Sequence, residues 1–412
     1  MNCQTRAYGG VPRRRFLAQT AALAGSLVAG CRTTPRRSAS EGPIQVPDPW
    51  VVDTMAETRT PGLSACYMRD GQVVWAQAYG WANVEAQVPM TPDTIQSIAS
   101  ISKTVTATAV MQLWQEGRFE LDDDVGDYVG FAVRNPHYPN VAISIRQLLT
   151  HTASIKDGPA YDDSYAPGDP TVSLREWVTQ YFNPGGRYYG KSTSYYRHRP
   201  GTKHRYSNVA YGLLGFLVEE VSGEPFNEYC TKRIFQPLGM KDTGWFLREV
   251  DLANHATLYA YIPPKKARRM KEPPELVAHV PENGGFAPLE LYSFPNYPDG
   301  LVRTSVREFA RFLIANLNAG ASILEPAALD EIFSVQFEES DEGDRWQGLA
   351  WYGEEDDQGR TVWSHSGGDP GVSTYAAIRP ADGVGVAAFA NIPSALPGRL
   401  VERLLKAAPS AV

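Results

Sequence analysis

Short apolar and aromatic runs, separated by turn residues, occupy both ends of the chain. Near the N-terminal end, "GLSACYMR" and "QVVWAQAYG" flank Asp70-Gly71, a dipeptide that predicts a two-residue β-hairpin. Toward the C-terminus the runs "GLAWYGEE", "RTVWSHSGG", "VSTYAAIRP" and "GVGVAAFAN" are rich in aromatic or β-branched residues and are separated by Asp and Gly, which predicts further strands.

The middle of the chain has helical composition instead. We expect a helix from Ser100 to Glu116 that ends at Gly117, and another helix at about 397–407. The predicted fold is therefore α+β, with one antiparallel sheet formed from both chain ends and flanked by helices, and a mainly helical insertion beside it. Residues 50–119 and 291–408 would form the sheet domain, and residues 120–290 the inserted domain.

The N-terminal segment has the features of an export signal. Three arginines, Arg13 to Arg15, precede a weakly apolar stretch at 16–30 that is too short to span a bilayer comfortably. "RRRFL" fits a twin-arginine signal, and "LVAGC" looks like a bacterial lipobox ending at Cys31. We expect residues 1–30 to be removed, Cys31 to carry a lipid anchor and residues 31–49 to form a tether. The protein would then be a periplasmic or outer-membrane lipoprotein; the alternative is a simple cleaved signal with an incidental cysteine.

Composition narrows the set of partners. The chain of 412 residues is 43% hydrophobic and 21% charged, which is ordinary for a folded protein. Its net charge of −7 becomes −11 without segment 1–30, which holds four arginines and no acids. This balance disfavours nucleic acid and anionic membrane surfaces as partners. Of the four cysteines, only Cys66 and Cys230 can form a disulfide in the mature chain, and the sequence leaves their pairing open.

Lys103 is the residue that does not fit its surroundings. It lies in "SISKTVTATAVMQLW", an otherwise apolar run in which burial of an ammonium costs more than the roughly 2–7 kcal/mol of a neutral polar group. Ser100 would share a helix face with Lys103, near the positive N-terminal end of the helix. A lysine that is desolvated has a lowered pKa and can activate a serine as a nucleophile. The alternative is a capping serine with a lysine that extends to solvent.

Further motifs favour the catalytic interpretation. "SIASISK", "IRQLLTHTASI", "RPGTKHRYSNVAYGLLG", "IFQPLGMKDT" and "HSGGDPG" follow one another along residues 50–405. In order and spacing the chain resembles the serine β-lactamase and penicillin-binding-protein family, closest to its class C β-lactamase, esterase and D,D-peptidase branch. The resemblance implies a β-lactamase/transpeptidase-like fold.

The resemblance also implies a role for each site residue. Ser100 matches the acylated nucleophile, Lys103 its partner lysine, and Tyr206 the second proton-transfer residue. Asn208, His365 and Ser366 match substrate-binding positions, and the N–H groups of Ser100 and Gly368 would form the oxyanion hole. His151 matches a structural packing element.

The third motif departs from the usual Lys-Thr-Gly, because His365-Ser366-Gly367 stands there. A histidine of ordinary pKa is largely neutral at pH 7 and protonates toward pH 6, so recognition of a substrate carboxylate should be weak at neutral pH.

These observations predict a secreted serine hydrolase that works through an acyl-enzyme on a small-molecule ester, amide or peptide. An esterase or a D-amino-acid peptidase or amidase is favoured. The alternatives are a true β-lactamase and, from a different class, a non-hydrolytic penicillin-binding sensor or scaffold. We expect no cofactor and no metal, because the histidines show no paired ligand spacing.

The lipid anchor can be tested directly. Replacement Cys31→Ser removes the thiol that would be lipidated, so the variant should leave the membrane fraction or accumulate as an unprocessed precursor. Membrane fractionation and the mass of the mature N-terminus measure both effects. Fractionation that is unchanged in the variant would contradict the anchor.

Overall fold

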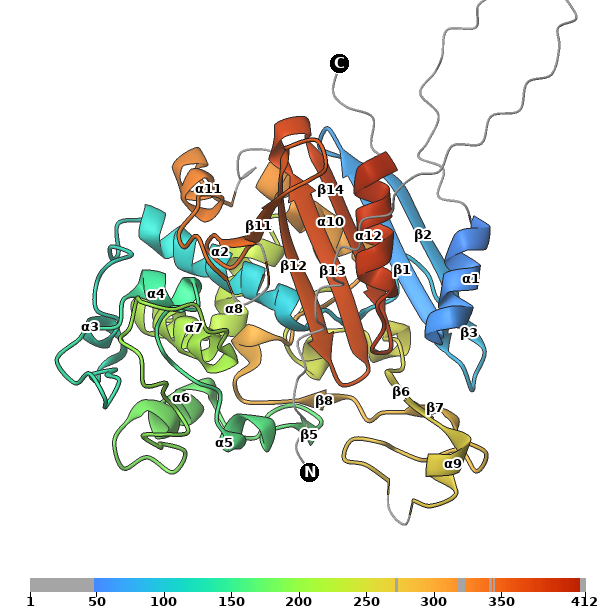
Figure 1. The fold of residues 1–412 in the computed structure, drawn as a ribbon, viewed down its shortest axis with the longest axis horizontal. Helices are drawn as coiled ribbons and strands as arrows, with labels where there is room; N and C mark the ends of the chain where they lie inside the picture. The colour runs from blue at the N-terminus through green and yellow to red at the C-terminus, as the bar shows by residue number, and fades with distance from the viewer. Residues whose placement is uncertain (1–47, 271–272, 318–322, 341–342, 344, 408–412) are drawn as a thin grey trace, which may run out of the picture.

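The structure is a computed structural model that describes residues 48–270, 273–317, 323–340, 343 and 345–407. The predicted signal, Cys31 and most of the tether lie outside the described residues. Eight strands form one antiparallel sheet in the order β10-β11-β12-β13-β14-β1-β2-β3 (Figure 1). These strands are β1 (Gly62–Arg69), β2 (Gln72–Asn83), β3 (Val88–Pro89), β10 (Trp346–Gln347), β11 (Tyr352–Glu355), β12 (Thr361–Asp369), β13 (Val372–Arg379) and β14 (Val384–Ala390).

The two ends of the chain meet in the middle of this sheet. Leu63 of β1 lies opposite Ala390 of β14 on one side and opposite Tyr79 of β2 on the other. The turn between β1 and β2 has positive φ at both Asp70 (49°) and Gly71 (74°), as a tight primed turn requires. The structure therefore confirms the predicted hairpin and the predicted sheet built from both chain ends.

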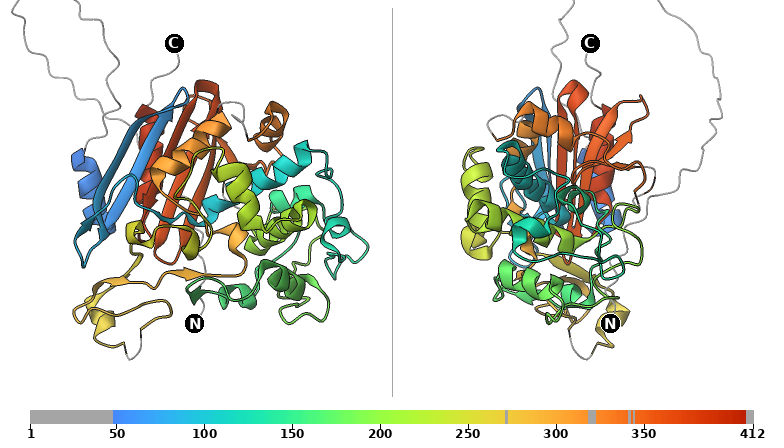
Figure 2. Two further views of the ribbon diagram at one scale, coloured as in Figure 1. Left: turned by 180° about the vertical axis from the view of Figure 1, so that it is seen from behind. Right: turned by 90° about the vertical axis from the view of Figure 1, so that its left-hand side faces the viewer.

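Helices cover both faces of the sheet (Figure 2). On one face α12 (Leu396–Ala407) packs on β13 and β14, with α1 (Asp48–Thr58) beside it. On the other face α10 (Val306–Leu317) packs on β14, β1 and β2. Helix α12 buries Leu396, Leu400, Val401 and Leu404, a spacing that places all four on one side of the helix.

Helix α2 (Ser102–Gln115) lies between the sheet domain and the helical part of the chain, where it packs against α7 (Asn208–Ser222). Every residue of α2 from Ser102 to Leu113 is buried. The helix ends as predicted, because Gly117 has a φ of 68° and its N–H donates to Trp114 O at 2.8 Å. The resulting core position explains the apolar composition of the run around Lys103.

The remaining elements are mostly short; some lie within the predicted insertion, and others, such as β9, α11 and η6, lie outside it. The helices are α3 (Gly126–Val129), α4 (Ile145–Leu149), α5 (Pro159–Asp162), α6 (Leu174–Phe182), α8 (Phe226–Cys230), α9 (Pro264–Ala267), α11 (Pro326–Ile332), the π-helical η2 (Thr231–Phe235) and the 3₁₀ turns η1 (Ala99–Ile101), η3 (Leu247–Glu249), η4 (Leu252–Asn254), η5 (Tyr297–Asp299) and η6 (Pro380–Asp382). The strands are β4 (Gln96–Ser97), β5 (Ala166–Pro167), β6 (Tyr259–Ile262), β7 (Gly285–Pro288), β8 (Tyr292–Ser293) and β9 (Arg303–Thr304). The predicted domain boundaries remain predictions.

The two cysteines in the described part of the chain, Cys66 and Cys230, are both buried and unpaired. Burial raises the pKa of the Cys66 thiol to about 12, and its S–H donates to Val306 O at 3.4 Å. A thiol with such a pKa is not a nucleophile at neutral pH. Within the same described residues, we find no helix with the length and apolarity needed to cross a membrane.

Candidate active site

Ser100 and Lys103 lie at the start of the buried helix. Ser100 occupies the 3₁₀ turn η1, two residues before the regular α-helix begins at Ser102, and it is partly exposed. The preceding residue, Ala99, has a φ of 47°, a left-handed conformation that costs a residue with a Cβ free energy and is concentrated at functional sites. Lys103 lies one turn further on, is 0% exposed, and donates from Nζ to Ser100 Oγ at 3.2 Å. The sequence prediction that these two side chains share a helix face is therefore confirmed.

The N-terminal end of α7 supplies two more of the predicted residues. Asn208 Oδ1 accepts a hydrogen bond from Lys103 Nζ at 2.7 Å. Tyr206 lies just before the helix, and Lys103 Nζ is 4.9 Å from the centre of its ring. Burial is the largest of the causes that lower the pKa of Lys103. The structure thus brings Ser100, Lys103, Tyr206 and Asn208 together, although Ser100 and Asn208 are far apart in sequence.

Asp157 orients this helix end, and the sequence analysis did not identify it. Its carboxylate accepts four hydrogen bonds, each at 3.0 Å, from Ser207 Oγ, the N–H groups of Asn208 and Val209, and Asn208 Nδ2. Burial raises the pKa of Asp157, and these donors oppose that shift. Because the Asn208 amide nitrogen is held by Asp157, its oxygen is left to accept from Lys103.

His151 was assigned a packing role from the sequence, and the structure places it directly behind Tyr206. The two ring centres are 4.3 Å apart, and His151 Nδ1 accepts from the N–H of Ser207 at 3.2 Å. Burial, followed by the charges nearby, lowers the pKa of His151 well below its usual value, so the ring is neutral. His151 is therefore a packing residue that fixes the position of Tyr206.

Strand β12 forms the opposite side of the site. His365 and Gly367 point into the protein, whereas Ser366 and Gly368 are exposed. A Cβ on Gly367 would lie 2.4 Å from Ile98 O and 2.2 Å from Thr374 Oγ1, so only glycine lets the strand approach the segment that carries Ser100. This approach is a precondition for an oxyanion hole between the N–H groups of Ser100 and Gly368, which itself remains a prediction.

His365 requires a correction to the sequence analysis. Its side chain is 2% exposed, packs near Tyr206 and Tyr352, and is bonded through Nδ1 to Ser366 O at 2.6 Å. Burial and then the charge of Lys103 lower its pKa to about 3. The expected protonation toward pH 6 is therefore wrong, because His365 is neutral throughout the physiological range. Its direct contact with a substrate remains a prediction.

Two further carboxylates lie at the site, and sequence reasoning missed both. Asp299, 2% exposed, lies with Oδ2 at 3.5 Å from Lys103 Nζ, and burial raises its pKa to about 6. Asp369 follows Gly368 on β12, and burial raises its pKa to about 7. Asp299 lies in "NYPDGL", and Pro-Asp-Gly is typical of a solvated turn, so the sequence contains no signal for a buried acid at this position. Nothing in the sequence pairs Asp299 with Lys103.

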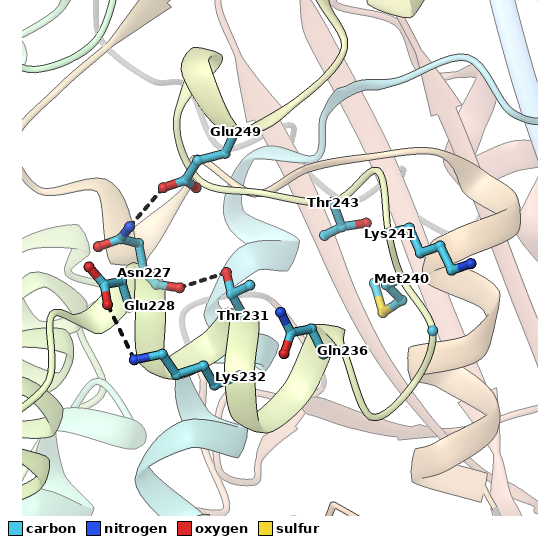
Figure 3. Close-up of a pocket in the computed structure, with 10 residues that line it drawn as sticks. Asn227, Glu228, Thr231, Lys232, Gln236, Met240, Lys241, Thr243 and Glu249 are labelled. Atoms are coloured by element: carbon cyan, nitrogen blue, oxygen red, sulfur yellow. Dashed lines mark hydrogen bonds and ion pairs between the residues drawn. The ribbon is translucent and has the colours of Figure 1, made fainter.

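A separate cleft of about 590 Å³ lies beside α8 and η2, and it contains none of the predicted site residues (Figure 3). Its lining residues are Asn227, Glu228, Thr231, Lys232, Gln236, Gly239, Met240, Lys241, Thr243 and Glu249. Asn227 Nδ2 donates to Glu249 Oε1 at 2.7 Å, and Lys232 Nζ lies 3.3 Å from Glu228 Oε2. These side chains therefore pair with one another within the cleft. In the part of the chain that the structure describes, we find no cluster of His, Cys, Asp or Glu side chains suited to a metal ion.

Comparison with protein families and known proteins gives the family and the fold of the chain. A family model described as Beta-lactamase matches residues 48–408. Protein flp of Staphylococcus aureus (strain MRSA252) is 31% identical over 185 residues, which are 45% of this chain and 35% of that protein. The matched region thus spans about a third of that relative's length.

Solved structures show the same fold. A penicillin-binding protein homologue from Pyrococcus abyssi, described as octameric, has a TM-score of 0.70 and 28% identity over 87% of this chain and 75% of its own. A D-amino acid amidase from Ochrobactrum anthropi SV3, complexed with L-phenylalanine amide, has a TM-score of 0.67 and 21% identity over 86% of this chain and 95% of its own.

The close approach of β12 to Ser100 predicts the effect of Gly367→Ala. The added methyl group would overlap Ile98 O and Thr374 Oγ1, so β12 must move away from η1, at a cost of about 1–3 kcal/mol typical of overpacking. Chemical unfolding measures that cost, and the rate at which a fluorophosphonate labels Ser100 should fall with it. The control is Gly398→Ala in α12, where a Cβ makes only ordinary contact with Tyr375 at 3.4 Å. Equal behaviour of the two variants would contradict the close packing.

Proposed function

Because the chain belongs to the Beta-lactamase family, we propose that it is a serine hydrolase that forms an acyl-enzyme on Ser100 with small ester or amide substrates. The observation that carries this proposal is the buried Lys103, whose Nζ lies 3.2 Å from Oγ of the partly exposed Ser100. Burial of a lysine beside a serine is costly, and it is explained if the pair performs a reaction. A scaffold or sensor that does not react would need neither this contact nor Tyr206 beside it.

In the proposed reaction, the Lys103–Tyr206 pair first loses one proton to solvent, and Ser100 Oγ then attacks the carbonyl carbon of the substrate while its own proton passes to that pair. These two groups adjoin, so they are expected to titrate as a coupled pair. The tetrahedral intermediate would place its oxyanion toward the N–H groups of Ser100 and Gly368. The proton is then delivered to the leaving alcohol or amine, and the acyl group remains on Ser100. Water attacks this ester by the same route in reverse, which releases the acid and restores the serine.

The charges around the site favour neutral substrates over carboxylates. Lys103 is already bound by oxygens of the protein, His365 is neutral, and Asp369 contributes negative charge at the exposed end of β12. An esterase or an amidase acting on D-amino acid derivatives is therefore preferred to a true β-lactamase. The fold similarity to a D-amino acid amidase is consistent with that choice. We also propose that the enzyme is exported and held by a lipid at Cys31, on the sequence features given above.

The nucleophile can be identified by covalent labelling. A fluorophosphonate should label the wild type with one adduct, placed on Ser100 by mass spectrometry, and Ser100→Ala should lose both labelling and hydrolysis of p-nitrophenyl esters. Ser366→Ala serves as the matched control, because it removes a nearby exposed hydroxyl and should still be labelled at Ser100. Persistent labelling of Ser100→Ala would show that another residue is the nucleophile.

The substrate preference should depend on pH through Asp369. Since its pKa is raised to about 7, Asp369 is largely neutral at pH 6 and largely ionised at pH 8. Ionisation repels the carboxylate of nitrocefin but not a neutral p-nitrophenyl ester. The ratio of kcat/KM for the ester to that for nitrocefin should therefore rise from pH 6 to pH 8, by up to about tenfold for a repulsion of about 1.4 kcal/mol.

Asp369→Asn provides the control for this measurement, because it removes the charge while keeping the size of the side chain. The ratio should then be nearly independent of pH over the same range. A ratio that rises equally in the variant would exclude Asp369 as the cause. Faster turnover of nitrocefin than of short-chain esters by the wild type would contradict the proposed substrate class.

A further inference from the structure

Asp299 contacts Lys103 twice, and the reaction outlined above does not use it. Its backbone carbonyl accepts from Lys103 Nζ at 2.8 Å, and its carboxylate Oδ2 lies 3.5 Å from the same nitrogen. The carboxylate is held in turn: Tyr161 donates its O–H to Oδ2 at 2.8 Å, and Asn296 Nδ2 donates to Oδ1 at 3.0 Å. Asp299 is thus a buried acid whose two side-chain oxygens both have partners.

The hydrogen-bond geometry at Lys103 Nζ matches an ammonium ion. Three oxygens lie within hydrogen-bond distance: Asn208 Oδ1 at 2.7 Å, Asp299 O at 2.8 Å and Ser100 Oγ at 3.2 Å. A lysine ammonium has three donors, so each of these oxygens can take one. A buried ammonium also needs a counter-charge, and the Asp299 carboxylate is the anion in ion-pair contact with it.

We propose that Asp299 is a positioning residue that holds Lys103 against Ser100 as an ammonium ion in the resting enzyme. The proposal rests on the serine-hydrolase function and adds to it the group that sets the charge of the Lys103–Tyr206 pair. Lys103 can lose and regain one proton during the reaction without leaving its position. After the loss, two donors remain for Asn208 Oδ1 and Asp299 O, and a lone pair is directed at Ser100. Asp299 acts through Lys103 and needs no contact with substrate.

Several other titratable groups face this ion pair and must be considered in any pH measurement. They are Asp157 before α5, Tyr161 in α5 and Tyr165 after it, Tyr206 and Tyr211 at the start of α7, His151 after α4, and His365 and Asp369 on β12. Both histidines are neutral, and burial raises the pKa values of Tyr161 and Tyr165 well above their usual range. Of the carboxylates, burial raises the pKa of Asp299 to about 6 and that of Asp369 to about 7, so both change charge within the range of an activity profile.

The sign of the effect follows from electrostatics. A negative charge beside the Lys103–Tyr206 pair favours its protonated form, and Asp299 is the largest of the charges that oppose the effect of burial on the pKa of Lys103. Removal of that charge should let the pair lose its proton at lower pH, whichever member is the base. An opposite charge at this distance typically shifts a pKa by about 1 to 3 units.

The test is Asp299→Asn, which keeps the backbone carbonyl and the size of the side chain but removes the charge. The second-order rate constant with which a neutral fluorophosphonate ester phosphonylates Ser100, with loss of fluoride, is measured from pH 5 to pH 10. We expect the acid limb of this profile to move by about 1 to 3 pH units toward lower pH. The control Asp163→Asn removes an exposed carboxylate just after α5 and should leave the limb in place. The profiles with and without Asp299→Asn are measured again in an Asp369→Asn background, which removes the other carboxylate that titrates in this range.

The position of the acid limb in Asp299→Asn tests the proposed role of Asp299. If Asp299→Asn lowers the maximal rate constant but leaves the acid limb at the same pH, Asp299 has a merely structural role and the proposal is overturned. An equal shift of the acid limb in Asp163→Asn would also overturn the proposal. An adduct on a residue other than Ser100 would overturn the proposed function itself. If Asp299→Asn does not fold, Tyr161→Phe replaces it: loss of the O–H donor makes ionisation of Asp299 harder, so the limb should move the same way by a smaller amount. No shift, or a shift toward higher pH, would overturn the proposal.

Discussion

The burial of one ammonium group is the constraint that organises this site. Lys103 has no contact with solvent, and transfer of a charged amine from water costs several kcal/mol unless its hydrogens and its charge are matched. The match comes from three separate segments: η1 with Ser100, the start of α7 with Asn208, and η5 with Asp299. None of these segments can move independently without exposing an unsatisfied donor, so the lysine fixes their relative positions.

Two glycines make this convergence possible by leaving out a side chain. Gly367 lets β12 lie against the turn that carries Ser100. Gly212 of α7 does the same for η5, because a Cβ there would lie 1.8 Å from Asn296 Oδ1. Asn296 uses this close approach to donate to Asn208 O at 2.9 Å and to Asp299 Oδ1 at 3.0 Å. These hydrogen bonds join α7 of the helical insertion to η5, which carries the carboxylate that neutralises Lys103.

The electrostatic character of the site follows from the same burial. The histidines near Tyr206 are neutral because they are desolvated beside a positive charge, so they act as apolar rings that shape the wall. The carboxylates, in contrast, keep hydrogen-bond donors: Tyr161 for Asp299, and Tyr165 for Asp369 at 2.9 Å. The protein therefore compensates the charge of Lys103 from within, through the Asp299 carboxylate and the oxygens around the ammonium group. The balance of charges in this site therefore differs from that of a site with lysine in place of His365.

Local signals in the sequence were sufficient for the longer strands β1, β2, β12, β13 and β14, the Asp70-Gly71 turn and the end of α2 at Gly117, because backbone conformation at each depends on a few neighbouring residues. The short strands β3 to β9 were not predicted. They were also sufficient for Ser100 and Lys103, which lie one helical turn apart, and the family's motifs indicated Tyr206 and Asn208. The sequence could not give the charge state of His365, because its pKa is set by burial and by Lys103 rather than by its neighbours along the chain.

Nor could the sequence give the roles of Asp157, Asp299 and Asp369. Each is an acidic residue that could equally have been solvated, and each acquires its partners from distant segments; Asp299 and Lys103 are 196 positions apart. Composition, spacing and the motifs therefore determined the fold class and indicated Ser100 as the candidate nucleophile. Only the tertiary structure decided which charges face one another, because electrostatic interactions depend on distance and desolvation in space and not on separation along the chain.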